Sequence, residues 1–420
     1  MDVMIKESFL VCYQNVDNVL FVLSTNAIID MCACDYTDVS YCEIDRIVDA
    51  HDEVTDDTGD TVTTSTEYLI KWRNLSYDEL TWERSDVVND THIARYFSIT
   101  QVPSKDELRV SQICVSTKYF INGKLQDIDT YNVTDKRIPP FNNGKSLREY
   151  QLEGLNWLIF KYMWSPGCLL ADEMGLGKTV QVASYLRYLY QVHKIRGPHL
   201  IIAPLSTVPH WQREIEEWTG LNAVVYHGSQ EARQEIRELE FRYKVSDDAT
   251  TKARYKHVYK FNVLITTDTI FLKDQSFLGK IMWNHLVVDE AHRLKNNTSQ
   301  LTQALRPLHC LHTVLMTGTP IQNNLHELYT LLTFCDPSKF GDEREFADKY
   351  GDLLDSNRQS MQQNTQLRDM LHTYLLRREK YDVEKSLPAR EEIMIEVEMT
   401  TAQKTYYKAI YDKVCHNTYD

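Results

Sequence analysis

Two short runs of residues in this chain have the types and spacing needed to handle a nucleotide. In residues 170–179 an apolar segment ends in a glycine loop, which is followed by Lys178 and Thr179. The backbone N–H groups of such a loop approach phosphates closely, a lysine counters their charge, and a threonine hydroxyl binds Mg²⁺. The expected nucleotide-binding residues are Asp172, Glu173, Met174, Gly175, Leu176, Gly177, Lys178 and Thr179.

The second run is Asp289 and Glu290, which follow the apolar residues Val287 and Val288 and precede Ala291 and His292. At the carboxyl end of a strand, Asp289 is expected to hold Mg²⁺ together with Thr179, and Glu290 to polarise a water molecule. Phosphoryl transfer requires positioning and electrostatics of this kind rather than covalent chemistry. The two runs together predict an ATP site with Mg²⁺, in which Lys178, Asp289 and Glu290 are catalytic.

The glycine loop by itself is a weaker signal. Asp172 stands where the usual phosphate loop has its first glycine, so the loop alone is also compatible with a chance turn before a helix. The acidic run downstream, in the right order and after an apolar strand, favours the ATP site over that alternative.

The charge of the chain is unevenly distributed. The formal net charge is -14 over 420 residues, and residues 1–140 hold 25 acidic and 12 basic side chains, a net charge of -13. The rest of the chain is almost neutral, and a balanced domain can still carry a basic strip that faces DNA. We therefore hypothesise that the acidic N-terminal third covers a DNA-binding surface, with a merely solubilising surface as the alternative.

Cysteine usage and hydropathy favour a soluble intracellular protein without a membrane partner. The nine cysteines contain no Cys-x-x-Cys pair, which is typical of ordinary thiols in a reducing compartment. A zinc site formed by Cys32, Cys34, Cys42 and His51 is an alternative, but its spacing fits no usual structural zinc pattern. Polar residues interrupt the apolar segment 8–23, so neither a signal peptide nor a membrane span is expected.

Residues 39–101 are expected to form a small β-rich module, and residues 1–38 remain unassigned. The pattern predicts strands at 41–49 and 67–72, an acidic loop from 51 to 66 and a third strand that ends near 83. A helix is expected near 91–97. Three short antiparallel strands closed by a helix suit a module of this size.

Beyond a linker at 102–144, strands and helices alternate. Continuous apolar runs such as 200–202 and 286–288 indicate strands that are buried on both faces, and therefore an α/β fold with a parallel, doubly covered sheet. The expected strands are 168–171, 199–203, 223–227, 262–266, 286–289 and 313–316. The expected helices are 147–162, 179–193, 208–218, 229–243 and 325–334.

Six ordered motifs resemble the first ATPase lobe of the Snf-type chromatin remodelers, a RecA-like helicase lobe, over residues 145–392. Besides the two runs above, these are residues 147–158, 201–211, 316–324 and 375–388. The β-rich module resembles a chromodomain. A chromodomain-like module followed by such an ATPase lobe resembles the chromodomain-helicase-DNA-binding group, most closely its Kismet-like branch. The resemblance implies a DNA-stimulated ATPase that translocates on duplex DNA in nucleosomes, a nuclear location, histones as possible partners, and Gln151 as the residue that contacts adenine.

The same resemblance implies residues that contact DNA or couple it to the ATP site. For each polar member, a capping hydroxyl or a turn asparagine is the alternative role. The expected residues are Ser206, Thr207, Trp211, Lys295, Thr317, Gly318, Thr319 and Asn323.

Chromodomains can hold methyl-lysine in a cage of aromatic side chains. Here the three cage positions are Cys42, Trp72 and Leu75, and two of them are not aromatic. We therefore expect a structural or gating role for the module, with Trp82 in its core.

The segment 393–420 resembles the start of a second lobe, which would need on the order of 150–200 further residues. The chain is accordingly expected to be the N-terminal part of a remodeler with low activity by itself. Two other functions stay open at this point. One is a catalytically incomplete chromatin-binding fragment that acts as a competitor or partner-binding protein, and the other is a strand-separating helicase.

Overall fold

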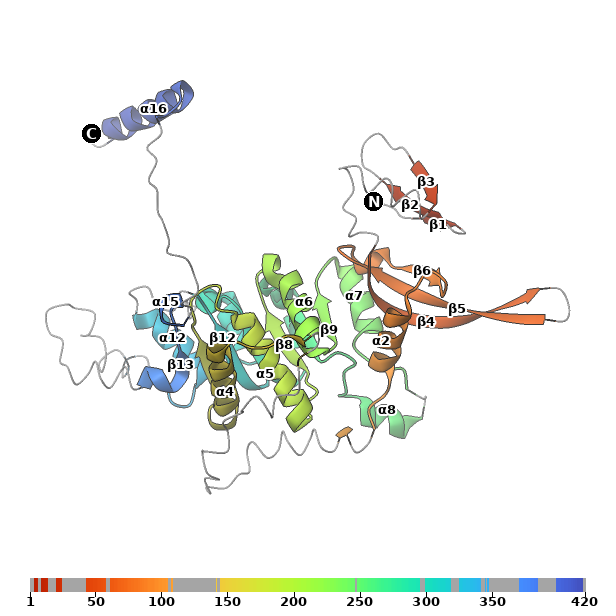
Figure 1. Cartoon of the computed structure of the whole chain (residues 1–420). Helices are drawn as coiled ribbons and strands as arrows, with labels where there is room; N and C mark the ends of the chain where they lie inside the picture. Colours follow the sequence, from red (N-terminus) through yellow and green to blue (C-terminus); the bar gives the residue numbers. More distant parts are fainter. Residues whose placement is uncertain are drawn as a thin grey trace, which may run out of the picture. The chain divides into compact units, whose positions relative to one another are not determined.

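The computed structural model describes most of the chain (Figure 1). The described residues are 4–6, 9–13, 20–24, 43–57, 61–104, 107–108, 141, 144–245, 248–294, 299–318, 325–340, 344, 346, 370–383 and 398–417. The chain divides into two units, Met1–Glu379 and Lys380–Asp420. The second unit contains α15 (Lys380–Val383) and α16 (Thr401–Asn417).

The larger unit is built on a seven-stranded sheet in which all neighbouring strands are parallel. Its order is β13-β7-β12-β11-β8-β10-β9. All six predicted strands are present, each within a few residues of the expected bounds. They are β7 (Gly167–Leu170), β8 (His199–Ile202), β9 (Ala223–Tyr226), β10 (Val263–Thr266), β11 (Trp283–Val288) and β12 (Cys310–Met316). The seventh strand, β13 (Leu375–Leu376), was not predicted, because two residues are too few to show a pattern.

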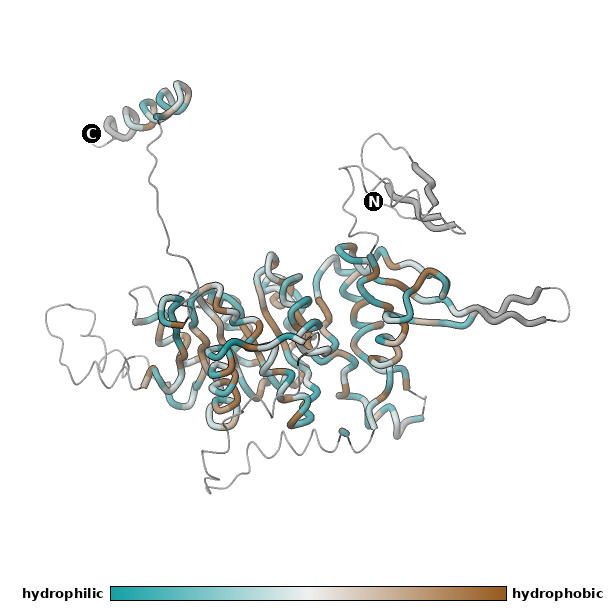
Figure 2. The backbone as a smooth tube through the Cα atoms, viewed as in Figure 1, coloured by the Kyte–Doolittle hydropathy of each residue, from teal (hydrophilic) through white to brown (hydrophobic). Residues whose placement is uncertain are grey.

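The sheet is buried on both faces, as its continuous apolar strands predict. Consecutive residues of one strand enter different cores: Leu286 belongs to one, and Val287 to the other. The alternation follows from the two-residue period of a strand. Figure 2 shows hydrophobic residues recurring along the strands and on the helices that cover them. This double burial holds the carboxyl edge of the sheet, where the polar motifs lie, on a rigid base.

The five predicted helices are present as α4 (Glu149–Trp164), α5 (Lys178–His193), α6 (Val208–Thr219), α7 (Gln230–Leu239) and α12 (Leu325–Cys335). One of them, α7, ends four residues earlier than expected. Among the described residues of the larger unit, four short α-helices were not predicted: α8 (Ala249–Tyr255), α9 (Asp268–Lys273), α10 (Gln275–Leu278) and α11 (Gln300–Leu305). Side-chain caps begin α8, α9 and α11, from Asp248, Thr267 and Ser299.

The β-rich module has the predicted three antiparallel strands and a closing helix. They are β4 (Ile44–Asp57), β5 (Thr61–Trp72), β6 (Thr81–Arg84) and α2 (Asp90–Thr100). The expected loop at 51–66 was wrong, since β4 and β5 run through most of it as a long hairpin. The β-branched residues of this segment favour strand over loop. The antiparallel pairing of β4 with β5 satisfies the backbone N–H and C=O groups, although the segment is rich in acidic residues.

The aromatic residues of the module are placed differently from what its sequence predicted. Trp82 was expected in the core but is 41% exposed, because the alternation along β6 turns it outward, where its ring meets that of His51 edge-on. Trp72 is the buried residue, and its indole N–H donates to Thr81 Oγ1 at 2.9 Å. Leu75 packs on the same core, and Cys42 lies outside the described residues. Trp72 therefore serves the core of the module rather than an open cage.

The module packs against the lobe through buried charges. Arg46 of β4, 6% exposed, donates to Glu216 Oε1 at 2.9 Å and to Asn222 Oδ1 at 3.2 Å, and lies 3.6 Å from Glu240 Oε1. Burial by itself would lower the pKa of Arg46, but the surrounding carboxylates, Glu240 foremost, raise it above its ordinary value. Tyr77 of η2 (Tyr77–Glu79) adds a hydrogen bond of 3.1 Å to Glu240. The guanidinium therefore stays charged in this contact.

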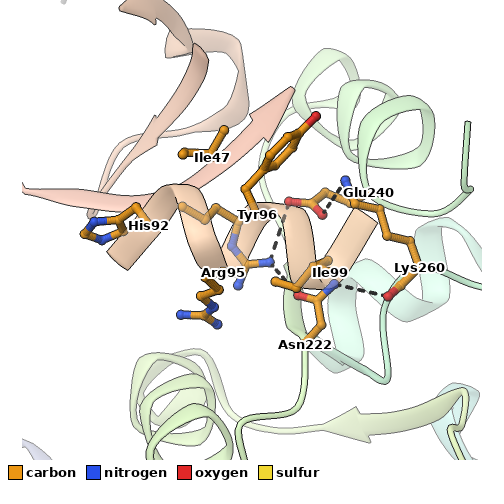
Figure 3. Close-up of a pocket in the computed structure, with 9 residues that line it drawn as sticks. Ile47, His92, Arg95, Tyr96, Ile99, Asn222, Glu240 and Lys260 are labelled. Carbon is orange, nitrogen blue, oxygen red and sulfur yellow. Dashed lines mark hydrogen bonds and ion pairs between the residues drawn. The ribbon is translucent and has the colours of Figure 1, made fainter. Parts of the chain in front are cut away.

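At this contact the module and the lobe line a small pocket (Figure 3). Side chains of α2 line one side, and Asn222, Glu240 and Lys260 of the lobe line the other. Arg95 of α2 reaches Glu216 at 2.7 Å. Val48 and Tyr77 of the module also belong to one of the two cores of the lobe. Module and lobe thus share both apolar and charged contacts.

Residues 1–38, left unassigned above, contain three short antiparallel strands, β1 (Met4–Lys6), β2 (Phe9–Tyr13) and β3 (Leu20–Ser24). Most of the linker at 102–144 lies outside the described residues, as do Cys32 and Cys34 of the zinc alternative. Over the described ranges no group of three or more His, Cys, Asp or Glu side chains is arranged to hold a metal ion. None of the helices in these ranges is long and apolar enough to cross a membrane.

Three histidines stand side by side inside the sheet, on β8, β11 and β12. His199, His285 and His312 are fully buried, and His199 Nδ1 lies 3.0 Å from His285 Nδ1. The Tyr185 hydroxyl meets His285 Nε2 at 2.7 Å, and Tyr162 stacks on the same ring. Burial lowers the pKa of His199 from 6.5 to about 3.

This cluster predicts acid sensitivity. Because the pKa of His199 is lower in the folded state, the unfolded chain takes up a proton first as pH falls below about 6.5. The free energy of unfolding should therefore drop by about 1.4 kcal/mol per pH unit between pH 6.5 and 3 from this group. His199→Asn, which keeps a polar atom near Nδ1 but does not titrate, should show a weaker fall of the urea midpoint as pH drops from 6.5 to 4.5. An unchanged slope in this variant would contradict the assignment.

Candidate nucleotide site and its link to the DNA motifs

The predicted site residues converge at the carboxyl edge of the sheet. The loop after β7 contains Asp172 to Gly177, β11 ends before Asp289, and β12 lies between these two strands and ends before Thr317. Strand β8 ends before the segment with Ser206 and Thr207. Since parallel strands present their carboxyl ends at one edge, four motifs far apart in sequence come together there.

Two glycines shape the nucleotide loop. Gly175 and Gly177 have φ angles of 85° and 76°, which residues with a Cβ rarely adopt, and Gly177 caps α5. The first N–H groups of α5 have no partner within the helix and lie at the positive end of its dipole. The loop and the amino end of α5 therefore have the geometry and the dipole that favour an anion.

Lys178, the first residue of α5, folds back over the loop. Its Nζ donates to the backbone oxygen of Asp172 at 2.9 Å and to that of Glu173 at 3.4 Å. Burial lowers the pKa of Lys178, and the nearby carboxylates, Glu290 foremost, act in the opposite direction. The ammonium is thus held at the mouth of the loop by two backbone oxygens.

The acidic pair is held rigidly at the end of β11. The N–H of Asp289 donates to the Ile202 carbonyl at 2.8 Å, and Asp289 Oδ1 accepts the Glu290 N–H at 2.9 Å. Glu290 has a φ of 50°, uncommon for a residue with a side chain, and its Oε2 lies 2.9 Å from His292 Nδ1. Strained backbone of this kind is often found at functional sites. Glu290 is therefore placed by the turn that follows the strand.

Gln151 of α4, the expected adenine contact, packs against the nucleotide loop at Leu176. Its Nε2 donates to the Leu176 carbonyl at 3.3 Å, and its Oε1 accepts the Arg148 N–H at 3.0 Å. A Cβ at Gly177 would lie 2.5 Å from Gln151 Nε2, so this contact also needs the glycine. The structure brings Gln151 to the nucleotide loop, and its contact with a base stays a prediction.

The expected DNA contact at Trp211 needs correction. The side chain lies on α6 and is fully buried, so it cannot touch a phosphate backbone. Instead its indole N–H donates to Asp289 Oδ2 at 2.8 Å. The helix that follows Ser206 and Thr207 is thereby bonded directly to the expected Mg²⁺ ligand.

Trp211→Phe keeps an aromatic ring at this position but removes the indole N–H that donates to Asp289. Partners that orient a metal ligand typically contribute about 10–100-fold to metal affinity. We therefore expect the Mg²⁺ concentration that half-saturates ATP binding, measured well below the melting temperature, to rise about tenfold. Trp218→Phe is a suitable control, since its ring lies on the same helix but packs against Phe141. Equal Mg²⁺ dependence in both variants would contradict a role for the indole N–H.

The remaining expected DNA and coupling residues fall into three groups. Ser206 is exposed, and Thr207 donates its hydroxyl to the Pro204 carbonyl at 3.0 Å as a local cap. Thr317 is buried at the end of β12, and the neighbouring Gly318 lies against Met174 of the nucleotide loop, where a Cβ would come within 2.5 Å of Met174 Cγ. This contact joins the motif after β12 to the loop. Lys295, Thr319 and Asn323 lie outside the described residues.

Sequence reasoning missed one buried polar contact at this site. Arg378, which follows β13, binds the carboxylate of Asp172 together with Gln181 of α5. The signal was the aspartate itself, because a carboxylate that directly follows a buried strand requires a cation or several donors. Nothing in the local sequence shows that the cation comes from 206 residues further along the chain.

Two known domain families match this chain. The SNF2-related domain matches residues 150–419, and the Chromo (CHRromatin Organisation MOdifier) domain matches residues 42–98. The chain belongs to the SNF2-related family, and its chromodomain followed by an SNF2-related domain places it with the chromodomain-helicase-DNA-binding proteins.

Three relatives illustrate the similarity over 89% of this chain. Identity is 41% to chromodomain-helicase-DNA-binding protein 6 of Rattus norvegicus, 42% to protein 7 of Homo sapiens and 41% to protein 8 of Xenopus tropicalis. The chain spans only 13%, 12% and 16% of their respective lengths. Among solved structures, the Sulfolobus solfataricus SWI2/SNF2 ATPase core in complex with dsDNA has 27% identity and a TM-score of 0.49, and the match covers 66% of this chain and 55% of that chain.

Proposed function

We propose that this chain is the ATP-binding part of an ATP-dependent chromatin remodeler, which hydrolyses ATP and moves along duplex DNA in nucleosomes. The observation that carries the proposal is the convergence of Lys178, Asp289 and Glu290 at one edge of a parallel sheet. Relatives named chromodomain-helicase-DNA-binding proteins support DNA as the partner and the nucleus as the location.

The residues fit Mg·ATP. The amino end of α5 and the ammonium of Lys178 would bind the β- and γ-phosphates, while Thr179 and Asp289 would hold Mg²⁺. When bound, Mg²⁺ would neutralise charge on the phosphate oxygens. Glu290 would orient the attacking water and accept its proton, and Gln151 would lie against the adenine. The support is the geometry of the loop, of the acidic pair and of the lysine between them.

The coupling of ATP to DNA is proposed to pass through α6. Its first turn follows Ser206 and Thr207, and its Trp211 reaches Asp289. If DNA contact shifted α6, the indole N–H of Trp211 would move relative to Asp289, the proposed Mg²⁺ ligand. The chromodomain, with Trp72 in its core, is proposed to position the lobe on nucleosomes rather than to read methyl-lysine.

The test is DNA-stimulated ATP hydrolysis in a chain long enough to contain both lobes of an SNF2-type ATPase, with naked duplex DNA and with mononucleosomes. We expect stimulation by both substrates, and repositioning of nucleosomes that stops without ATP. A forked duplex should not be unwound, which separates translocation from strand separation. Hydrolysis that ignores both DNA and nucleosomes would refute the proposal.

A further inference from the structure

The nucleotide loop begins with a fully buried carboxylate. Asp172 Oδ1 accepts Nε of Arg378 at 3.0 Å, and Oδ2 accepts Nη2 of Arg378 at 2.6 Å. Gln181 of α5 donates a third hydrogen bond to Oδ2 at 3.1 Å. A two-point guanidinium–carboxylate contact of this kind fixes both distance and orientation.

Arg378 is itself held from several directions. Its Nη2 also donates to Gln181 Oε1 at 2.8 Å, and its Nη1 donates to the backbone oxygen of Tyr150 in α4. The main chain takes part as well, because the Glu173 N–H donates to the Arg378 carbonyl at 3.0 Å. The side chain of Arg378 is only 10% exposed. It therefore ties β13, α4, α5 and the loop to one point.

The packing around this point leaves no spare room. A Cβ at Gly154 of α4 would lie 1.9 Å from Gln181 Oε1 and 2.7 Å from Arg378 Nη2. Gly154 therefore provides the space that the guanidinium and the amide occupy. The contact also explains why an aspartate stands where other phosphate loops have a glycine: Asp172 does not need a positive φ here, and its side chain serves as an anchor.

We propose that Arg378 is a positioning residue for the nucleotide loop, which it holds in the ATP-binding conformation through the Asp172 carboxylate. The link to the nucleotide is short, since the backbone oxygens of Asp172 and Glu173 are the acceptors that hold Lys178. Loss of the guanidinium would leave a buried carboxylate with one amide partner, and the loop would have to move to hydrate it. This inference rests on the proposed function, in which the loop binds ATP.

The test compares Arg378→Ala with Arg377→Ala in the full 420-residue chain. Arg377 is the matched control, because it precedes Arg378 directly, is 42% exposed and pairs only with Glu379, at 3.4 Å, among the described residues. We expect Arg378→Ala to raise the Kd for a fluorescent ATP analogue with Mg²⁺ at least tenfold, well below the melting temperature. Amide hydrogen exchange of residues 171–178 should become faster. Arg377→Ala should change neither quantity.

A second substitution that removes the buried charge of Asp172 distinguishes a positioning role of Arg378 from a general effect on stability. In Asp172→Asn/Arg378→Ala the buried charge is gone, so ATP affinity should recover part of the loss seen in Arg378→Ala. Arg378→Lys, which cannot make the two-point contact, should lie between wild type and Arg378→Ala. If Arg378→Ala does not fold, these two variants carry the same comparison.

Two outcomes are distinguishable. Unchanged ATP affinity and loop exchange in the Arg378 variants, while Lys178→Ala loses binding, would overturn the positioning role and leave the proposed function intact. If instead the wild-type chain binds the analogue no better than Lys178→Ala, the proposed function fails. Faster loop exchange in Arg378→Ala would still report the contact with Asp172 in that case.

Discussion

Replacing Lys178 by alanine should abolish Mg·ATP binding, whereas Glu290→Gln should bind Mg·ATP normally and hydrolyse it about 10²–10⁴-fold more slowly. Lys178 lies at the mouth of the nucleotide loop and would act on the phosphates both before and during transfer. Glu290 lies across the site, after β11, and would act mainly on the attacking water. The two substitutions therefore separate binding from chemistry.

Binding is measured by titration with a fluorescent ATP analogue, and hydrolysis by phosphate release in a chain that contains both ATPase lobes. Lys194→Ala is a control for the loss of a lysine, since it caps the opposite end of the same helix. Turnover by Glu290→Gln at the wild-type rate would show that another group activates the water. Tight ATP binding by Lys178→Ala would remove the lysine from the phosphate site.

The second large effect is expected at the contact between the chromodomain and the lobe. Arg46→Ala should destabilise the chain by about 3–5 kcal/mol, because it leaves Glu240, only 2% exposed, without its nearest guanidinium. Lys260 stays 3.9 Å from Glu240, but burial lowers its pKa, so it is a weaker compensating charge. We expect a lower urea midpoint and faster hydrogen exchange across α2 and η2.

Arg73→Ala is the matched control for this prediction. Arg73 lies in the same module and pairs with Glu43, but both side chains are about half exposed, so its removal should cost about 0–1 kcal/mol. A second variant, Arg46→Met/Glu240→Gln, removes both buried charges and should be more stable than Arg46→Ala. Equal effects of Arg46→Ala and Arg73→Ala would mean that the buried contact does not hold the module on the lobe.

The sequence by itself determined the parts of the fold that depend on local pattern. Apolar runs such as Leu286 to Val288 showed a sheet covered on both faces, and all six predicted strands are present. Motif order placed both Asp289 and the loop that leads to Lys178 directly after strands, and the topology of a parallel sheet then brings them to one edge. The periodicity of apolar residues, and the turn residues that bound each run, suffice for such conclusions.

The tertiary structure alone decided which distant side chains meet. Trp82, which was expected in the core, is exposed, because strand register rather than hydropathy selects the face of β6 that is buried. The partners of Trp211, Arg46 and Arg378 lie 78, 170 and 206 residues away along the chain. Each of these contacts satisfies a charged side chain that the fold has at least partly removed from water. The local sequence records the need for a partner, but only the packed chain supplies it, because the cost of burying a charge arises when distant elements close over it.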